Sequence, residues 1–181
     1  MAPILGIIAS SISGSISSNS FESIATVTVG SGGASYAEFT SIPSTYTHLQ
    51  VRGMLKNSSN DGILMRLNSD TGSNYSAHYL YGNGTSAFGD NSVPTSYFYL
   101  ASGSTSVQPS AFVMDLLDYA NVNKYKTGRI LSGTEVNGSG SYVWLFSGNW
   151  RNTAAVSTIR IYPNAGTLQQ YSHFALYGIK S

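Results

Sequence analysis

Apolar and polar residues alternate with a period of two along most of the chain after residue 20. In Thr47–Leu55, for example, Leu49 and Val51 fall on one face, and Gln50 and Arg52 fall on the other. A period of two is that of a β-strand with one face buried, whereas an amphipathic helix repeats every 3.6 residues. The pattern therefore predicts strands, and no stretch of the chain has a convincing helical period.

Short strands separated by turn-forming residues are expected along the whole body of the chain. We expect them at Ile24–Val29, Ala34–Phe39, Thr47–Leu55, Ile63–Leu67, Tyr75–Tyr81, Ser96–Leu100, Ala111–Leu117, Tyr125–Ser132, Ser141–Trp150, Val156–Tyr162 and Tyr171–Ile179. Many short strands with frequent turns are typical of an all-β antiparallel β-sandwich or jelly roll. No fixed internal repeat indicates a propeller or a solenoid.

Three local features add more specific expectations. Asp61-Gly62 is a strong hairpin signal, and the stretch from Gly82 to Pro94 is expected to be a long polar loop. Tyr36 and Phe39 are candidate core residues. Both faces of the last strand are largely apolar, so we expect Phe174 in the core and the opposite face against a second layer or a neighbouring subunit.

Aromatic residues are concentrated in the predicted strands. Tyr97, Tyr99, Tyr142, Trp144 and Trp150 could form a platform that stacks on sugars. Aromatic residues in strands are more often part of a core, because they bury a large apolar area. The sequence leaves both interpretations open.

The composition limits the classes of function. Charged residues are 9% of the chain and the net charge is +1, whereas Ser, Thr, Asn and Gly make up 77 of the 181 residues. A binder of nucleic-acid phosphates needs clustered Lys and Arg, so no nucleic-acid partner is expected. The chain has no Cys, and no apolar run approaches the ~20 residues of a membrane-spanning helix. No membrane partner is expected.

Candidate chemistry is sparse. The eight Asp and Glu and the three His are scattered, and no nucleophile motif precedes a helix. The segment Asn68-x-Asp70-x-Gly72-x-Asn74 spaces oxygen ligands as calcium loops do, but it lacks a closing Glu, so we expect a simple turn. The chain is therefore predicted to be no enzyme, with no catalytic residues, no cofactor and no metal site.

The first twenty residues differ from the rest. They carry no charge, and the apolar stretch Pro3–Ala9 precedes a tract of Ser, Gly and Ile. No Lys or Arg precedes the apolar stretch, so it does not read as a secretory signal. We expect residues 1–20 to form an extended docking arm and residues 21–181 to form the β-sandwich domain. The candidate docking residues are Pro3, Ile4, Leu5, Ile7 and Ile8.

Four stretches resemble small virion proteins of tailed bacteriophages, especially those of aquatic hosts. These stretches are Pro3–Gly14, Ser41–Gly53, Asp115–Gly133 and Gln170–Lys180. The resemblance implies a structural protein at the particle surface, without active-site residues. A neutral exterior of hydroxyls and amides suits such a surface, since its contacts depend little on salt.

The resemblance leaves several roles open. The leading one is a capsid decoration or head-fibre protein anchored by the N-terminal arm to the phage capsid or to other virion proteins. The alternative is a tail or baseplate component, including a receptor-binding fibre protein that contacts host-surface glycans, and a third is a free carbohydrate-binding module. A homo-oligomer is expected, with a trimer favoured because capsids and fibres offer three-fold sites. Tyr177 and Ile179 are the candidate subunit-interface residues.

Overall fold

The computed structural model describes residues 20–105, 108–136 and 140–180. These residues form twelve β-strands and no α-helix. The strands are β1 (Phe21–Thr28), β2 (Ala37–Phe39), β3 (His48–Leu55), β4 (Gly62–Leu67), β5 (Tyr75–Gly82), β6 (Ala87–Thr95), β7 (Phe98–Ser102), β8 (Ser110–Leu117), β9 (Lys126–Thr134), β10 (Tyr142–Trp150), β11 (Ile159–Pro163) and β12 (His173–Ile179).

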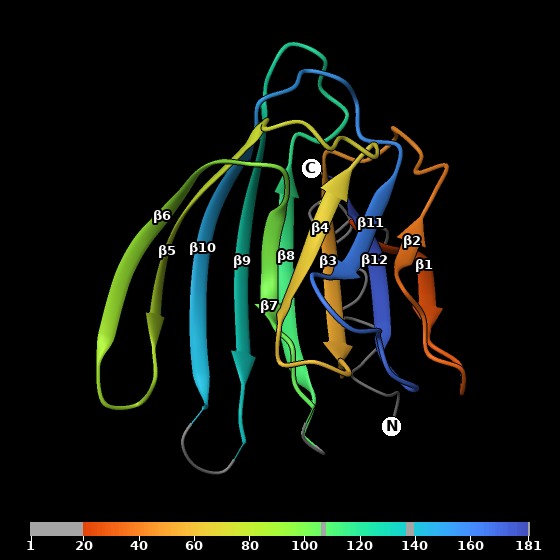
Figure 1. The fold of residues 1–181 in the computed structure, drawn as a ribbon. Coiled ribbons are helices and arrows are strands. Elements are labelled where there is room, and N and C mark those ends of the chain that lie inside the picture. Colours follow the sequence, from red (N-terminus) through yellow and green to blue (C-terminus); the bar gives the residue numbers. More distant parts are fainter. Residues whose placement is uncertain (1–19, 106–107, 137–139, 181) are drawn as a thin grey trace, which may run out of the picture.

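The strands form two antiparallel sheets that pack as a β-sandwich, as the alternation predicts. The large sheet has eight strands in the order β1-β12-β3-β8-β9-β10-β5-β6, and the small sheet has four in the order β2-β11-β4-β7. The small sheet lies over one side of the large sheet, while β5 and β6 extend beyond it (Figure 1). The large sheet therefore has a covered part and an overhanging part.

The core lies between the two sheets, where the alternation of the sequence places its apolar face. Leu49, Val51 and Leu55 of β3 are completely buried, as are Phe174 and Leu176 of β12. The expected core position of Phe174 is thereby confirmed. The opposite face of the large sheet points away from the small sheet.

Two glycines allow the sheets to approach closely at the edge of the covered part. Phe98, at the start of β7, is buried against Gly128 of β9 and Gly148 of β10. A Cβ atom added at Gly148 would lie 2.5 Å from Phe98 Cε1, which is closer than van der Waals contact permits. Glycine at this position therefore seats the ring of Phe98 on the large sheet.

Three local expectations are wrong, for different reasons. The stretch from Gly82 to Pro94 is mostly strand β6, whose exposed edge position removes the apolar face by which a strand is recognised. Asp61-Gly62 closes no hairpin, because β3 pairs with β12 and β8 while the chain crosses to the small sheet at β4. Tyr36 is 46% exposed, with Arg160 over its ring, while Phe39 is buried.

Among the residues that the structure describes, Lys126 has a charged side chain that is completely buried. The Lys126 ammonium, at the start of β9, donates to the backbone carbonyls of Asn121, Lys124 and Thr153. Burial lowers the pKa of Lys126. Three acceptors satisfy all three donors of the ammonium, as a buried charge requires.

Among the described residues there is no helix of the length and apolar character needed to cross a membrane.

Candidate ligand-binding groove

The strongest candidate site lies where the large sheet extends past the small one. Strand β6 forms the edge of the large sheet, and the chain then passes through Ser96 and Tyr97 into β7, the edge of the small sheet. The connection is short, so the two edges are held close together at this corner. Arg66 of β4 fixes the connection, since its Nε donates to the Ser96 carbonyl at 3.1 Å.

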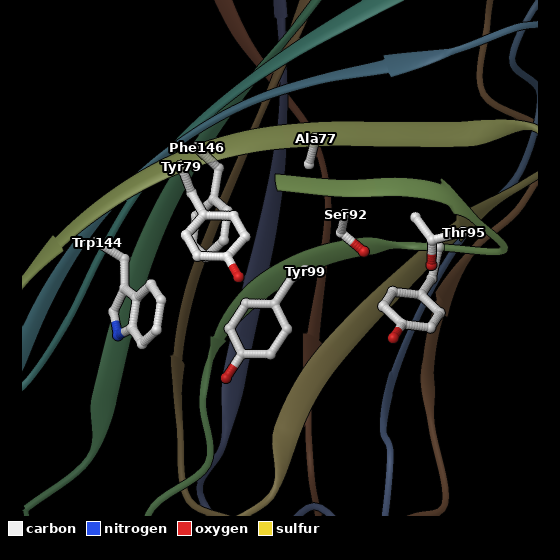
Figure 2. A pocket seen from close by; sticks show the side chains of 8 residues that line it. Ala77, Tyr79, Ser92, Thr95, Tyr99, Trp144 and Phe146 are labelled. Carbon is white, nitrogen blue, oxygen red and sulfur yellow. The ribbon is translucent and has the colours of Figure 1, made fainter. Parts of the chain in front are cut away.

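The corner encloses a groove of about 220 Å³. Its walls come from β5, β6, β10 and the start of β7, and Figure 2 shows the rings of Tyr79, Tyr99, Trp144 and Phe146 gathered at one end of it. We call it the aromatic groove. Its lining residues are Ala77, Tyr79, Ser92, Thr95, Tyr97, Tyr99, Trp144 and Phe146. None of them carries a formal charge at neutral pH.

Cross-strand pairing builds the aromatic wall. Trp144 of β10 pairs in register with Tyr81 of β5, and Tyr81 pairs with Phe88 of β6. The rings of Tyr81 and Trp144 stack with centroids 4.2 Å apart, and those of Tyr81 and Phe88 stack at 4.8 Å. Directly opposed aromatic pairs stabilise a sheet. The stack continues the groove toward the outer edge of the overhang.

Polar atoms are set among these rings. The Trp144 Nε1–H is buried and has no hydrogen-bond partner among the described residues. The Tyr99 hydroxyl lies 3.2 Å from Ser102 Oγ. The pKa of Tyr79 is raised by burial and by the neighbouring carboxylate of Asp90, to which the Tyr79 hydroxyl donates a hydrogen bond. The groove thus combines flat apolar surfaces with hydroxyl and indole groups.

The lining of the groove is aromatic, hydroxyl-bearing and without formal charge. No cluster of three or more Asp, Glu or His that could hold a metal ion occurs in the described part of the chain. The aromatic groove itself is lined by no carboxylate, imidazole or amine. What it offers a ligand is stacking surface and a small number of directed hydrogen bonds.

The calcium-like segment 68–74 forms a hydrogen-bonded turn, as expected. The Asp70 carboxylate accepts from Trp150 Nε1 at 2.7 Å, from Asn74 Nδ2 at 3.0 Å and from the Gly72 amide at 2.8 Å. Asn68 binds the backbone of the segment before β11 instead. Asp70 therefore holds the turn to the end of β10, and Asn68 holds it to the segment before β11.

The structure places the predicted interface residues on β12, and it does not describe the predicted docking residues. Pro3, Ile4, Leu5, Ile7 and Ile8 lie outside the described residues. Tyr177 is partly buried on the outer face of β12, where its ring stacks on Phe21 at 4.9 Å and lies under the Arg52 guanidinium. Ile179 is partly buried at the end of the same strand, next to β1.

The aromatic residues singled out in the sequence divide between core and groove. Trp150 is in the core, 1% exposed, whereas Tyr97, Tyr99 and Trp144 line the groove. Tyr142 lies beside Trp144, with ring centroids 6.0 Å apart. Sequence reasoning missed Tyr79, Phe146 and the polar Ser92 and Thr95 as lining residues. The signal for Tyr79 was its shared parity with Tyr75 and Tyr81.

Comparisons with known proteins find no close relative of this chain. No family model and no curated protein matches the sequence. A search of solved structures finds the galectin LEC-6 of Caenorhabditis elegans, with a TM-score of 0.35 and 9% sequence identity over 92% of this chain and 99% of that chain. A likeness of this degree does not indicate a shared function.

Proposed function

We propose that this protein is a non-enzymatic binding protein of a tailed-phage particle, and that its aromatic groove holds a neutral glycan of the host surface. The observation that carries the proposal is the groove itself: an uncharged pocket walled by Tyr79, Tyr99 and Trp144. Partly exposed aromatic rings set among a few polar groups are typical of sites that bind flat, hydroxyl-rich ligands.

The shape of the groove defines the ligand further. Its volume of about 220 Å³ lies below the ~300 Å³ at which pockets for drug-sized ligands begin, so it accommodates one ring-sized unit. A sugar ring has apolar C–H faces that stack on aromatic rings, and hydroxyls that can form hydrogen bonds with Ser92, Thr95 and Tyr97 of the lining. The absence of charge among the eight lining residues favours a neutral sugar over a sialic or uronic acid.

The setting in a phage particle rests on the sequence resemblance. A glycan-binding groove favours the tail or receptor-binding alternative over capsid decoration, because a receptor-binding protein must recognise a host structure. Capsid decoration through residues 1–20 stays as the second candidate, on the strength of the uncharged apolar stretch Pro3–Ala9. Copy number distinguishes the roles: hundreds per particle for a head protein, and a few to a few dozen for a tail protein.

The experiment is a titration with a panel of neutral oligosaccharides, followed by tryptophan fluorescence. The chain has two Trp, and Trp150 is 1% exposed, so a saturable change in emission reports on Trp144. Calorimetry then measures affinity for the Tyr79→Ala variant. We expect at least a tenfold loss, because about 1.4 kcal/mol of stacking disappears with the ring.

The matched control is Tyr171→Ala. Tyr171 is 76% exposed in the segment before β12 and does not line the groove, so its removal should leave the affinity unchanged. A panel in which no neutral sugar gives a saturable signal would contradict the proposal. Equal affinity of wild type and Tyr79→Ala would place the glycan elsewhere.

A further inference from the structure

The outer face of the large sheet carries an uninterrupted field of exposed apolar side chains. Backbone register sets Leu80, Leu145, Leu131 and Val113 directly opposite one another on β5, β10, β9 and β8. Val143 lies two residues before Leu145 on the same face, and Met54 lies on β3 opposite Ala111. We call Met54, Leu80, Val113, Leu131, Val143 and Leu145 the outer apolar field.

These side chains are far more exposed than is usual for Leu and Val. Leu80 and Val143 are each 61% exposed, Leu131 56% and Leu145 51%. A sheet face that is exposed to water normally carries polar residues, as the outer positions Gln50 and Arg52 of β3 do. At these exposed fractions the field presents on the order of 600 Å² of apolar surface, the upper end of what a monomer exposes.

Charged residues lie at the border of the field and not within it. Arg52 lies opposite Val113 at one end, where its guanidinium is over the rings of Phe21 and Tyr177. Asp115 and Arg129 are paired in register two residues beyond Val113 and Leu131. The field is therefore neutral, and the nearest polar row contains both signs of charge.

We propose that a second copy of this chain covers the outer apolar field, with the two large sheets packed back to back. Two β-sheet faces pack about 10 Å apart when apolar residues cover both. A two-fold axis brings a surface against itself, and the uncharged centre of the field avoids placing like charges against each other in the middle of the contact. Burying ~600 Å² on each copy gives ~1,200 Å², the lower end for a specific interface.

A lipid surface fits the same field less well. Faces that bind membranes combine apolar residues with Lys or Arg and with Trp or Tyr at the interface. The outer apolar field contains none of these residue types. The proposed pairing is independent of the aromatic groove, which lies on the opposite face of the same strands.

Analytical ultracentrifugation of the full chain tests the proposal, with the variants Leu145→Lys and Leu131→Thr. The wild type is expected to be a dimer at micromolar concentration, and Leu145→Lys is expected to raise the dissociation constant at least 100-fold. Leu131→Thr places a β-branched residue, which favours strand geometry, at this position, and it should weaken the dimer by a smaller factor. Circular dichroism verifies that both variants are folded.

The matched control is Val122→Lys. Val122 is also 61% exposed, but it lies in the turn between β8 and β9 and outside the field. It should dimerise like the wild type. A monomeric wild type overturns the proposal and leaves residues 1–19 or another protein as the occupant. A dimer or trimer that persists in Leu145→Lys also overturns it, because the contact then lies elsewhere. Glycan titration is unaffected by either result.

Discussion

The covered and the overhanging parts of the large sheet share one inner face, but the small sheet covers that face only in the first of them. In the covered part the inner residues are buried, and many of them are aliphatic, as Val51 and Leu176 are. In the overhang they are Tyr79, Tyr81 and Trp144, which are partly exposed. Both parts follow the same alternation. The comparison teaches that the period of the sequence fixes which way a side chain points, while the residue type reflects how much covers it.

The largest expected effect comes from breaking the covered part. Phe174→Ala removes a ring that is 0% exposed between the sheets, so the lost transfer free energy and the cavity left behind should lower the free energy of unfolding by about 3–5 kcal/mol. Chemical denaturation followed by circular dichroism measures this. A loss below about 1 kcal/mol would mean that the two sheets do not form a common core at β12.

The same substitution in the overhang should cost much less. Phe88 is 44% exposed on the edge strand β6, and its main contact is the stack on Tyr81. Phe88→Ala should therefore lower the free energy of unfolding by only about 1 kcal/mol. The same denaturation experiment compares it with Phe174→Ala. Equal losses in the two variants would remove the distinction between the two parts of the sheet.

The smallest expected effect concerns the covered end of β10 and depends on pH. Burial raises the pKa of Asp70, whereas the hydrogen bonds from Trp150, Asn74 and Gly72 together lower it by more. The net shift of this pKa is therefore downward. A carboxyl with a lowered pKa in the folded state contributes stability above its unfolded value near 4, and that contribution disappears as the pH falls through the folded value.

Asp70→Asn should therefore be less stable than the wild type at pH 7, by less than about 1 kcal/mol because the carboxylate is partly exposed. The difference should shrink as the pH falls from about 4 to about 2. Melting temperatures across this range measure it. A difference that grows toward acid would mean that the Asp70 carboxylate opposes folding.

Much of the fold follows from the sequence because alternation is a local property. The inner positions of Tyr75–Tyr81 and of Ser141–Trp150 are visible in the sequence and hold in the structure. The sandwich class follows from the number and spacing of such strands. The distribution of the aromatic residues does not, since Trp144 and Trp150 share a strand and a parity, yet one lines the groove and the other is in the core.

The missed features depend on which strands become neighbours. The sequence of strand β6 predicts a loop because an edge strand outside the sandwich needs no apolar face. Asp61-Gly62 reads as a hairpin because a turn signal does not reveal that the next strand joins the other sheet. The aromatic groove depends on the first of these facts and on a second crossing between the sheets, since its walls are β5, β6, β10 and the passage from β6 into β7. The local pattern of the sequence therefore predicts some of the residues of the aromatic groove, but it does not predict that the groove exists.

The buried ammonium of Lys126 has a kinetic consequence. Its three acceptors belong to two segments, the turn between β8 and β9 and the stretch after β10 that contains Thr153. Separating these segments strips a charge of its hydrogen bonds before water can replace them, which raises the barrier to opening at this end of the molecule. An amine-reactive reagent that is fast compared with closing would therefore modify Lys126 at the rate of that opening, while the exposed Lys124 reacts at once.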